Sequence, residues 1–544
     1  MDLSGLPTWG IGLLLGLNLS PVLALPQALG ENGTDTAGLE RSPWNLTGKD
    51  VWIGQLELSR PRKFGFDRPL NSLEKSQVDP AQVFFRDRSA TPNRHLDEHS
   101  HQVAAVMISR DRLYRGVAPA ANLIASAYAD RGQGGQLEAL VAAQHLLKQG
   151  NSLVRAVNLS FGEPLAAQAD LDGGSWLSLG LDWLAYTYNS LLVVSGNQAK
   201  GGIPVPTDLF NGLVVGFTRQ DRDQVYRILD RNNLIDEPFV DRNFNHRYDP
   251  GEIFTDLNQD GRWTAKVESP KDGRRSLALL APGADLQVPR PDGKIGTTRG
   301  TSFAAPLVTG TVALLQEYAD RLIRANRWSM DARRPEVIKA TLLNSADKIQ
   351  DQGDGQNLGM TKTIYDWRGK TWLDCDAYQD RALPLCDFLG AGQLNTRRAL
   401  QQFAAGQQSP GVVRALGWNY GAIQPRQVHD YYFDRPLVGG SLVVATLSWQ
   451  RRVVLKDSNG DRAFNQGESF RAAPINHLYL YLMAADQPDS EQNIWSSVSA
   501  VDNLQHLALR IPHTGRYKLR TVFHRQQDQD LQLYAIAWWA KTER

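Results

Sequence analysis

Cysteine is scarce in this 544-residue chain, opposite charges are balanced, and no apolar run is long enough to span a membrane. The 59 basic and 58 acidic residues leave a formal net charge of +1, and no stripe of Lys and Arg stands out. The sequence therefore offers no electrostatic footprint for nucleic acid. The two cysteines, Cys375 and Cys386, do not lie in a context that resembles a catalytic thiol or a zinc site. They close a small disulfide loop if the protein is exported, or remain two buried thiols if it is not.

The first 24 residues have the features of an export signal. An apolar stretch from Ile11 to Leu25 is shorter than the roughly 20 residues that a membrane-spanning helix needs, and it suits a secretory signal core that is cleaved after Ala24. No Lys or Arg precedes this stretch, so an N-terminal anchor or a wrongly assigned start codon stays open. We expect residues 1–24 to be a signal segment and the protein to be secreted, periplasmic or on the cell surface. Residues 25–47, rich in Gly, Asn, Thr and Pro, are predicted to be a linker.

The middle of the chain has the pattern of an α/β fold. The composition, 42% apolar and 22% charged, is that of a globular protein, and the length predicts at least two domains. From Val51 onward, short apolar strands alternate with longer stretches that have helical spacing, and this pattern fades near Leu400. Such alternation predicts a doubly wound parallel sheet with helices on both faces, here over residues 48–405.

Beyond about residue 405 the apolar pattern changes to a period of two. Leu478, Leu480 and Leu482 alternate with other residues, and further short strands follow up to the C-terminus. This pattern predicts an antiparallel β-sandwich domain over residues 406–544. We expect it to stabilise the protein, with surface or carbohydrate contact through its aromatic residues as the alternative role.

The most specific motif is Gly300-Thr-Ser-Phe-Ala-Ala-Pro306, which stands at the head of an apolar helix. A serine there lies among the free backbone N–H groups and the positive end of the helix dipole. An ordinary N-cap serine is the alternative, but such a run of small residues before an apolar helix is much rarer. The run resembles the nucleophile motif of the subtilisin family of serine peptidases, which implies that the α/β domain has the subtilisin fold and that Ser302 is the nucleophile.

This resemblance also implies a histidine base upstream of the serine. The family pattern His-Gly-Thr-His-Val-Ala-Gly is similar to the run that starts at His99, where Val103 and Ala104 set the register. His99 is thereby implied as the base that activates Ser302. Four positions of the run depart from the pattern, namely Ser100, His101, Gln102 and Ala105.

The third member of the family's catalytic triad is an acidic residue that orients the histidine. It comes first in the chain, followed by the histidine and then the serine. The family has Asp in a Val-Ile-Asp setting at the end of a buried strand, and this chain has Gln55-Leu56-Glu57 there. The resemblance implies Glu57 as the acid, with a side chain one methylene longer, and serine hydrolases of other folds use Glu in this role. The alternative is that Glu57 is an ordinary strand-end charge.

Two further segments are similar to family motifs for the oxyanion donor and the substrate. The strand that ends in Gly196 and Asn197 resembles the family's Ala-Gly-Asn motif and implies that the Asn197 amide binds the oxyanion. The segment Asn158-Leu-Ser-Phe-Gly162 resembles the strand against which substrate lies. The implied substrate-binding residues are Ser160, Phe161, Gly162 and Gly196.

Three Asp- and Asn-rich segments have the spacing of EF-hand calcium loops, two of them within an insertion at about residues 220–274. The expected ligands of the first loop are Asp241, Asn243, Asn245, Arg247 through its carbonyl, Asp249 and Glu252; those of the second are Asp256, Asn258, Asp260 and Arg262; those of the third are Asp457, Asn459, Asp461, Ala463, Asn465 and Glu468. His246 replaces the usual Gly of the first loop, and the second has Val267 where Glu is expected. We expect structural calcium, since a cation neutralises clustered carboxylates and ties down a long loop.

Together these patterns predict a secreted, calcium-stabilised serine endopeptidase that acts on protein or peptide substrates and has no stable membrane span. The alternative is a catalytically inactive scaffold or calcium-dependent binding protein on the same fold. We expect no inhibitory pro-domain before Val51, where the sequence leaves little room for one.

Overall fold

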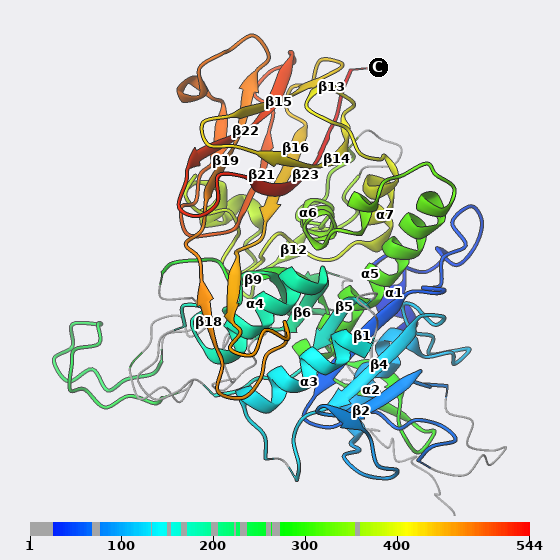
Figure 1. The fold of residues 1–544 in the computed structure, drawn as a ribbon. Coiled ribbons are helices and arrows are strands. Elements are labelled where there is room, and N and C mark those ends of the chain that lie inside the picture. Colours follow the sequence, from blue (N-terminus) through cyan, green and yellow to red (C-terminus); the bar gives the residue numbers. More distant parts are fainter. Residues whose placement is uncertain are drawn as a thin grey trace, which may run out of the picture.

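The central β-sheet and the helices around it form the lower part of the molecule, and antiparallel sheets form the upper part (Figure 1). The structure is a computed structural model. It describes residues 25–67, 77–131, 133–149, 154–164, 171–196, 205–221, 225–228, 237–256, 263, 272–353 and 359–543.

Among the described residues, ten strands form the central sheet, in the order β12-β8-β7-β6-β5-β1-β4-β2-β3, with β9 also paired to β7. Their bounds are β1 (Trp52–Glu57), β2 (Gln82–Phe85), β3 (Arg88–Ser89), β4 (Asn122–Ala127), β5 (Val154–Leu159), β6 (Leu191–Ser195), β7 (Gly212–Gln220), β8 (Tyr226–Arg227), β9 (Leu277–Pro282) and β12 (Ile364–Tyr365). The pairs that join β2, β4, β1, β5, β6, β7 and β9 are all parallel. The carboxyl ends of these strands therefore meet at one edge of the sheet.

Helices cover both faces of this sheet. Helices α2 (Glu98–Ile108) and α5 (Thr301–Arg324) pack together on one face, and α3 (Gln136–Gln149) and α4 (Trp176–Tyr188) pack on the other. Alternate strand residues face the two layers: Ala156 lies in the core with α5, while Val157 lies in the core with α3. The prediction of a doubly wound parallel sheet with helices on both faces is confirmed.

Helix α2 begins at the edge of the sheet where the carboxyl ends of the strands meet, and Asp97 caps it. The Asp97 backbone is extended, and its side chain accepts a hydrogen bond from the Ser100 backbone N–H at 2.7 Å. Helix α5 begins after Gly300, whose φ of 134° is a conformation that side-chain-bearing residues rarely adopt. These two starts place His99 and Ser302 each at the second residue of a helix.

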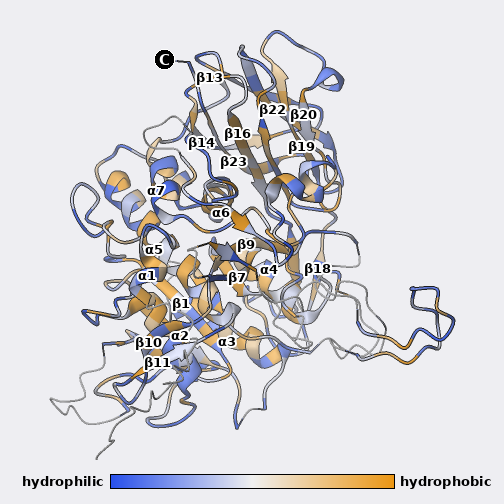
Figure 2. Ribbon diagram, turned by 180° about the vertical axis from the view of Figure 1, so that it is seen from behind, coloured by the Kyte–Doolittle hydropathy of each residue, from blue (hydrophilic) through white to orange (hydrophobic). Residues whose placement is uncertain are grey.

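The C-terminal region contains two β-sheets that share one apolar core, so the prediction of an additional antiparallel β domain is confirmed. Five strands form one sheet and four form the other: β13 (Gly411–Val413), β15 (Val428–Phe433), β22 (Tyr517–Arg525), β19 (His477–Ala484) and β20 (Trp495–Ser497), then β14 (Leu416–Ile423), β23 (Gln532–Ala540), β16 (Leu442–Trp449) and β21 (Leu504–Arg510). All pairs are antiparallel except β13 with β15. Hydrophobic residues gather on the inner strands and helices, and hydrophilic residues on the surrounding loops (Figure 2).

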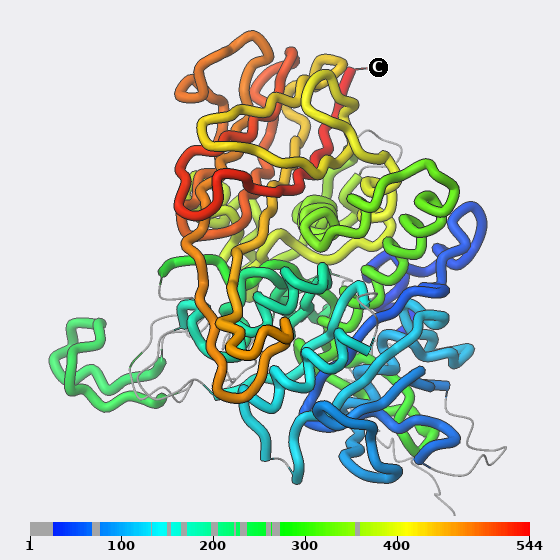
Figure 3. Tube along the Cα trace, viewed as in Figure 1, coloured from blue at the N-terminus to red at the C-terminus, as the bar shows by residue number. Residues whose placement is uncertain are grey.

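Two helices and one hairpin join the upper and lower parts. Helices α6 (Pro335–Asn344) and α7 (Thr396–Ala404) lie against β14 and β23, and the Trp539 indole N–H donates to the Asn344 carbonyl at 3.2 Å. The hairpin of β17 (Val453–Lys456) and β18 (Ser469–Ala472) runs down from the upper part to α4. In Figure 3 this orange hairpin lies beside the cyan helices. The loop at its tip meets α3 through two hydrogen bonds between Gln144 and the Phe464 backbone, at 3.0 and 2.7 Å.

Residues 25–47, expected to form a linker, are packed against the central domain instead. Leu25 and Ala28 of α1 (Leu25–Leu29) are fully buried in its main core. At the end of this segment, the Glu317 carboxylate of α5 accepts three successive backbone N–H groups, starting at Thr47, at 2.7 to 3.2 Å. The Gly and Asn residues of this segment suggested a linker, but in the structure they allow tight turns. A few apolar residues between these turns are buried.

Two further expectations concern export. Cys375 and Cys386 form a disulfide bond. Within the described ranges, no helix has the length and apolar character to cross a membrane. The expected signal segment, residues 1–24, lies outside the described residues.

Candidate active site

A carboxylate and an imidazole meet at the carboxyl edge of the sheet. Glu57 is the last residue of β1, and its Oε2 lies 2.8 Å from Nδ1 of His99 on α2. The Glu57 side chain is only 2% exposed, whereas the His99 side chain is 41% exposed. Since a carboxylate only accepts hydrogen bonds, the proton of the neutral His99 ring lies on Nδ1, which leaves the Nε2 lone pair available as a base.

The Glu57 carboxylate has two other donors besides His99. The Gln55 amide nitrogen donates to Glu57 Oε1 at 2.7 Å and to the Ser100 carbonyl oxygen at 2.8 Å. The Ser100 hydroxyl lies 3.1 Å from Glu57 Oε2 and 2.9 Å from the Ser59 carbonyl oxygen, so its single hydrogen is shared between them. Both carboxylate oxygens are therefore hydrogen-bonded within a buried site.

The charge of Glu57 changes the acidity of the imidazole. Burial disfavours the charged imidazolium and opposes the change, but the Glu57 charge, its hydrogen bond and the charge of Asp97 outweigh this. The pKa of His99 is therefore raised above its ordinary value. The site stabilises the protonated ring, which is the form that a base reaches after it takes a proton.

Ser302 lies beside this pair, at the start of α5. The ring of the next residue, Phe303, makes an edge-on contact with the His99 ring at 5.3 Å between centroids. The Ser160 hydroxyl donates to the Ser302 carbonyl oxygen at 2.9 Å, and the Thr301 hydroxyl donates to the Gly196 carbonyl oxygen at 2.7 Å. The ends of β5 and β6 thus hold the first turn of α5 in place.

The expected substrate-binding residues border this turn. Ser160 and Phe161 are buried directly after β5, and Gly196 follows β6, where its N–H donates to the Val215 carbonyl oxygen at 2.9 Å. The Phe161 ring lies 4.9 Å from the Tyr128 ring, centroid to centroid. Asn197, the expected oxyanion donor, lies outside the described residues.

A second carboxyl group lies close to this border. Glu163, two residues after Phe161, accepts a hydrogen bond from the Tyr128 hydroxyl and is buried. Burial raises the pKa of Glu163, and the hydrogen bond from Tyr128 opposes this shift.

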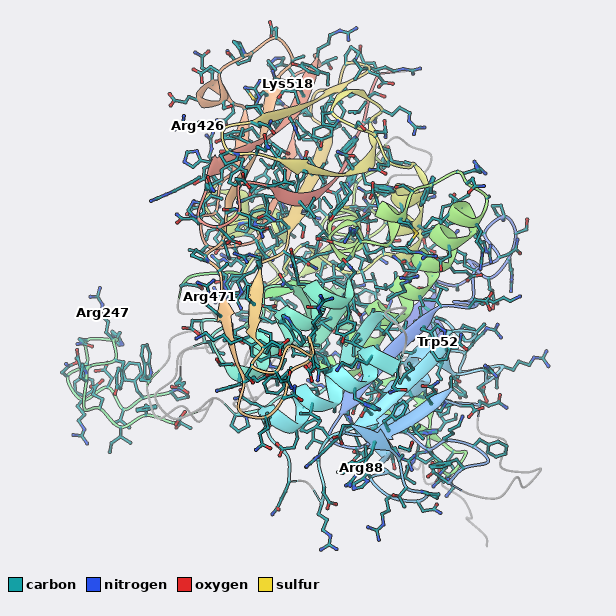
Figure 4. All side chains as sticks on the ribbon, in the orientation of Figure 1. Trp52, Arg88, Arg247, Arg426, Arg471 and Lys518 are labelled. Carbon is teal, nitrogen blue, oxygen red and sulfur yellow. A yellow bond between two sulfur atoms is a disulfide. The ribbon has the colours of Figure 1, made fainter. Side chains whose placement is uncertain are left out.

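The first candidate calcium loop, 241–252, lies in a segment that projects from the rest of the molecule, where Arg247 is labelled in Figure 4. Asp241, at position 1, accepts the backbone N–H of His246 at position 6 at 2.8 Å. Glu252, at position 12, accepts the N–H groups of positions 2 and 9 at 2.8 and 3.0 Å. Left-handed backbone at positions 4 and 6, with φ of 58° and 60°, makes the turn that Gly usually makes.

The third loop, 457–468, repeats this geometry in the upper part of the molecule. Asp457 accepts the N–H of position 6 at 2.8 Å, and Glu468 accepts those of positions 2 and 9 at 2.8 and 2.9 Å. Positions 4 and 6 are again left-handed, with φ of 76° and 59°. The two loops therefore share one conformation, and their oxygen-rich side chains are the donor type that Ca²⁺ prefers.

The Asp and Glu side chains of these two loops do not form a cluster that could hold a metal ion by themselves. Across the described residues, no group of three or more His, Cys, Asp or Glu side chains is arranged to hold a metal ion. Asn side chains and a backbone carbonyl supply the other expected ligands. Of the second loop, Asp256 is described, whereas Asn258, Asp260 and Arg262 lie outside the described residues.

Gln55 is the site residue that the motif analysis missed, and Ser100 appeared there only as a departure from a pattern. Both hydrogen-bond to Glu57. The available signal was a polar side chain two residues before Glu57 on a buried strand, because residues two apart on a strand face the same side.

One family model matches more than half of the chain. The model of the subtilase family matches residues 71–361, which includes His99 and Ser302 and begins after Glu57. No curated protein matches the chain.

Three solved structures are similar to this chain over about two thirds of its length. The prenylagaramide maturation protease PagA is 20% identical, with a TM-score of 0.40, over 68% of this chain and 98% of its own. The self-cleaved protease domain of PatA is 19% identical, with a TM-score of 0.39, over 67% of this chain and 100% of its own. MycP1 with its N-terminal propeptide removed is 15% identical, with a TM-score of 0.37, over 65% of this chain and 92% of its own.

Proposed function

This chain belongs to the subtilase family of serine peptidases, and from this premise we propose that it is a calcium-stabilised endopeptidase that forms an acyl-enzyme on Ser302. The observation that carries the proposal is the 2.8 Å contact of His99 Nδ1 with Glu57, beside the helix turn that bears Ser302. An inactive scaffold has no need for a buried carboxylate that raises the pKa of a half-exposed imidazole.

In the proposed reaction, His99 Nε2 takes the Ser302 hydroxyl proton as the serine oxygen attacks the peptide carbonyl carbon. The resulting imidazolium is stabilised by Glu57, which also keeps the ring in the required tautomer. The imidazolium then gives its proton to the leaving amine as the peptide bond breaks. A water molecule, deprotonated by the same ring, hydrolyses the ester and restores Ser302.

The carbonyl oxygen of the attacked peptide becomes negatively charged, and hydrogen-bond donors must lie next to it. We assign the first donor to the Ser302 backbone N–H, because Ser302 is the second residue of α5 and the dipole of this 24-residue helix favours an anion there. We assign the second donor to the Asn197 side chain, from its position after β6. Substrate would lie as an extended strand along Ser160, Phe161 and Gly162, with Gly196 across from them.

Calcium is proposed for the loops at 241–252 and 457–468, and for the loop that starts at Asp256. Their support is the shared loop conformation of the first and third, in which Glu at position 12 is held by two backbone N–H groups. A bound cation would neutralise Asp and Glu side chains and restrain each loop, without a part in the chemistry.

We further propose that the protein acts outside the cytoplasm, as a secreted, periplasmic or cell-surface protein. The disulfide between Cys375 and Cys386 supports this, because such bonds persist in oxidising compartments.

Cleavage of a denatured protein substrate tests the endopeptidase activity. We expect internal cleavage by the purified wild-type chain with calcium present, and loss of cleavage in Ser302→Ala. A folded wild-type protein that leaves denatured casein intact at neutral pH would favour the inactive scaffold.

A further inference from the structure

Three residues around the candidate acid depart from the family pattern, and they contact one another. Gln55 stands where the pattern has Val, Glu57 where it has Asp, and Ser100 where it has Gly. The Gln55 amide nitrogen donates both of its hydrogens, one to Glu57 Oε1 at 2.7 Å and one to the Ser100 carbonyl oxygen at 2.8 Å. The departures therefore form one hydrogen-bonded unit that connects β1 to the start of α2.

The orientation of the Gln55 amide follows from its partners. Both are oxygens that only accept hydrogen bonds, so the amide nitrogen must face them. The amide oxygen then points elsewhere in the core, where Gln55 is 1% exposed and this oxygen has no hydrogen-bond partner among the described residues. Leaving a buried acceptor unpaired is unfavourable for folding. The two hydrogen bonds that the amide nitrogen donates are therefore the reason to have an amide at this position.

The Gln55 amide nitrogen restrains the carboxylate of Glu57, whose side chain is longer than that of Asp. Glu has one more rotatable side-chain bond than Asp, so its carboxylate has more positions available. Catalytic groups must be held within about 0.5 Å of their productive geometry. With Oε1 bound by Gln55, Oε2 is the oxygen that meets His99 Nδ1.

We propose that Gln55 is a positioning residue that allows a Glu to serve as the acidic member of this triad. Gln55 acts only through Glu57, and the Ser100 hydroxyl, shared with the Ser59 carbonyl, is a weaker second restraint. This inference rests on the proposed peptidase function. It implies that the contribution of Gln55 disappears when residue 57 is shortened to Asp, because the shorter carboxylate recedes from the amide.

A double-mutant cycle between Gln55→Leu and Glu57→Asp tests this coupling. In the Glu57 enzyme, we expect Gln55→Leu to lower kcat about 10- to 100-fold with little change in KM, since a misplaced catalytic group costs about that much. In the Glu57→Asp enzyme, the same change should lower kcat less than about threefold. Equal losses in the two backgrounds, or a loss confined to KM, would overturn the proposal. Gln55→Met, which also lacks the donor and keeps an unbranched side chain, is measured alongside with the same expectation.

The matched control is Gln402→Leu. Gln402 is equally buried, its amide nitrogen donates to a backbone carbonyl, that of Trp538 at 3.4 Å, and its oxygen also has no partner among the described residues. It lies on α7, away from Glu57, so kcat should stay within about twofold of wild type. Wild-type protein without Ser302-dependent cleavage would refute the peptidase function itself. Active wild type with additive losses would refute only the role of Gln55.

Discussion

At the scale of single residues, the central interaction is the buried charge of Glu57 against His99. The resemblance to family motifs predicted both residues, and the structure brings them into contact. It did not reveal that Ser100 would bind the same carboxylate, because that contact depends on how β1 and α2 pack against each other.

Replacing Glu57 by Gln should change the pH dependence as well as the rate. We expect kcat to fall roughly 10³- to 10⁴-fold, since the amide no longer stabilises the imidazolium or enforces one tautomer. The negative charge raises the pKa of His99, so its removal should lower this pKa. Because the neutral ring is the base, the acidic limb of kcat/KM against pH should move to lower pH.

The control for this measurement is Glu98→Gln, which removes a charge next to His99 in the chain. Glu98 is exposed and pairs with Arg290 at 2.7 Å rather than with the imidazole. Its acidic limb should move much less than that of Glu57→Gln. The assignment of Glu57 would be contradicted if the acidic limb shifted equally in both variants, or if it moved to higher pH in Glu57→Gln.

At the scale of elements, strands and helices of the central sheet follow the apolar periodicity of the sequence, since each buries a face within its own segment. The docking of the β17–β18 hairpin on α3 and α4 could not be predicted in this way. Gln144 and Phe464 are joined by two hydrogen bonds although they lie 320 residues apart. Around them, Trp183 and Phe470 pack at 5.7 Å between ring centroids, which adds apolar contact.

Gln144→Ala should therefore destabilise the whole protein without a direct effect on the site. The change leaves the buried Phe464 N–H and carbonyl unpaired, which costs about 1–3 kcal/mol. Urea unfolding should show this loss, and Gln149→Ala, an exposed position on the same helix, should change stability by less than about 0.5 kcal/mol. Equal stability of the two variants would mean that the hairpin contact contributes nothing.

At the scale of the whole molecule, the sequence predicted two regions and their fold classes but not how they are joined. The spacing of apolar residues predicts which face of each helix or strand is buried, but not which segment covers it. Residues 25–47, α6 and α7 are buried by segments distant in the chain. The loop at 457–468 lies at the tip of the hairpin that joins the two regions, so a cation there would stabilise both of them together.

Calcium should raise the unfolding midpoint of the intact protein. Calcium at 100 times its dissociation constant would stabilise the folded state by about 2.7 kcal/mol per site, and a chelator would reverse this. Glu468→Gln should lose part of the calcium-dependent shift, because position 12 is a bidentate ligand in loops of this type. Asp486→Asn, an exposed acid outside the loops, should keep the full shift. A midpoint that ignores both calcium and chelator would refute the metal proposal.

The most direct measurement of the central claim is covalent labelling of the folded protein by a fluorophosphonate, with the modified residue located by mass spectrometry. A serine activated by His99 and Glu57 should carry a single adduct on Ser302, and His99→Ala and Ser302→Ala should each abolish it. An unlabelled folded wild-type protein, or an adduct that persists in His99→Ala, would contradict the account.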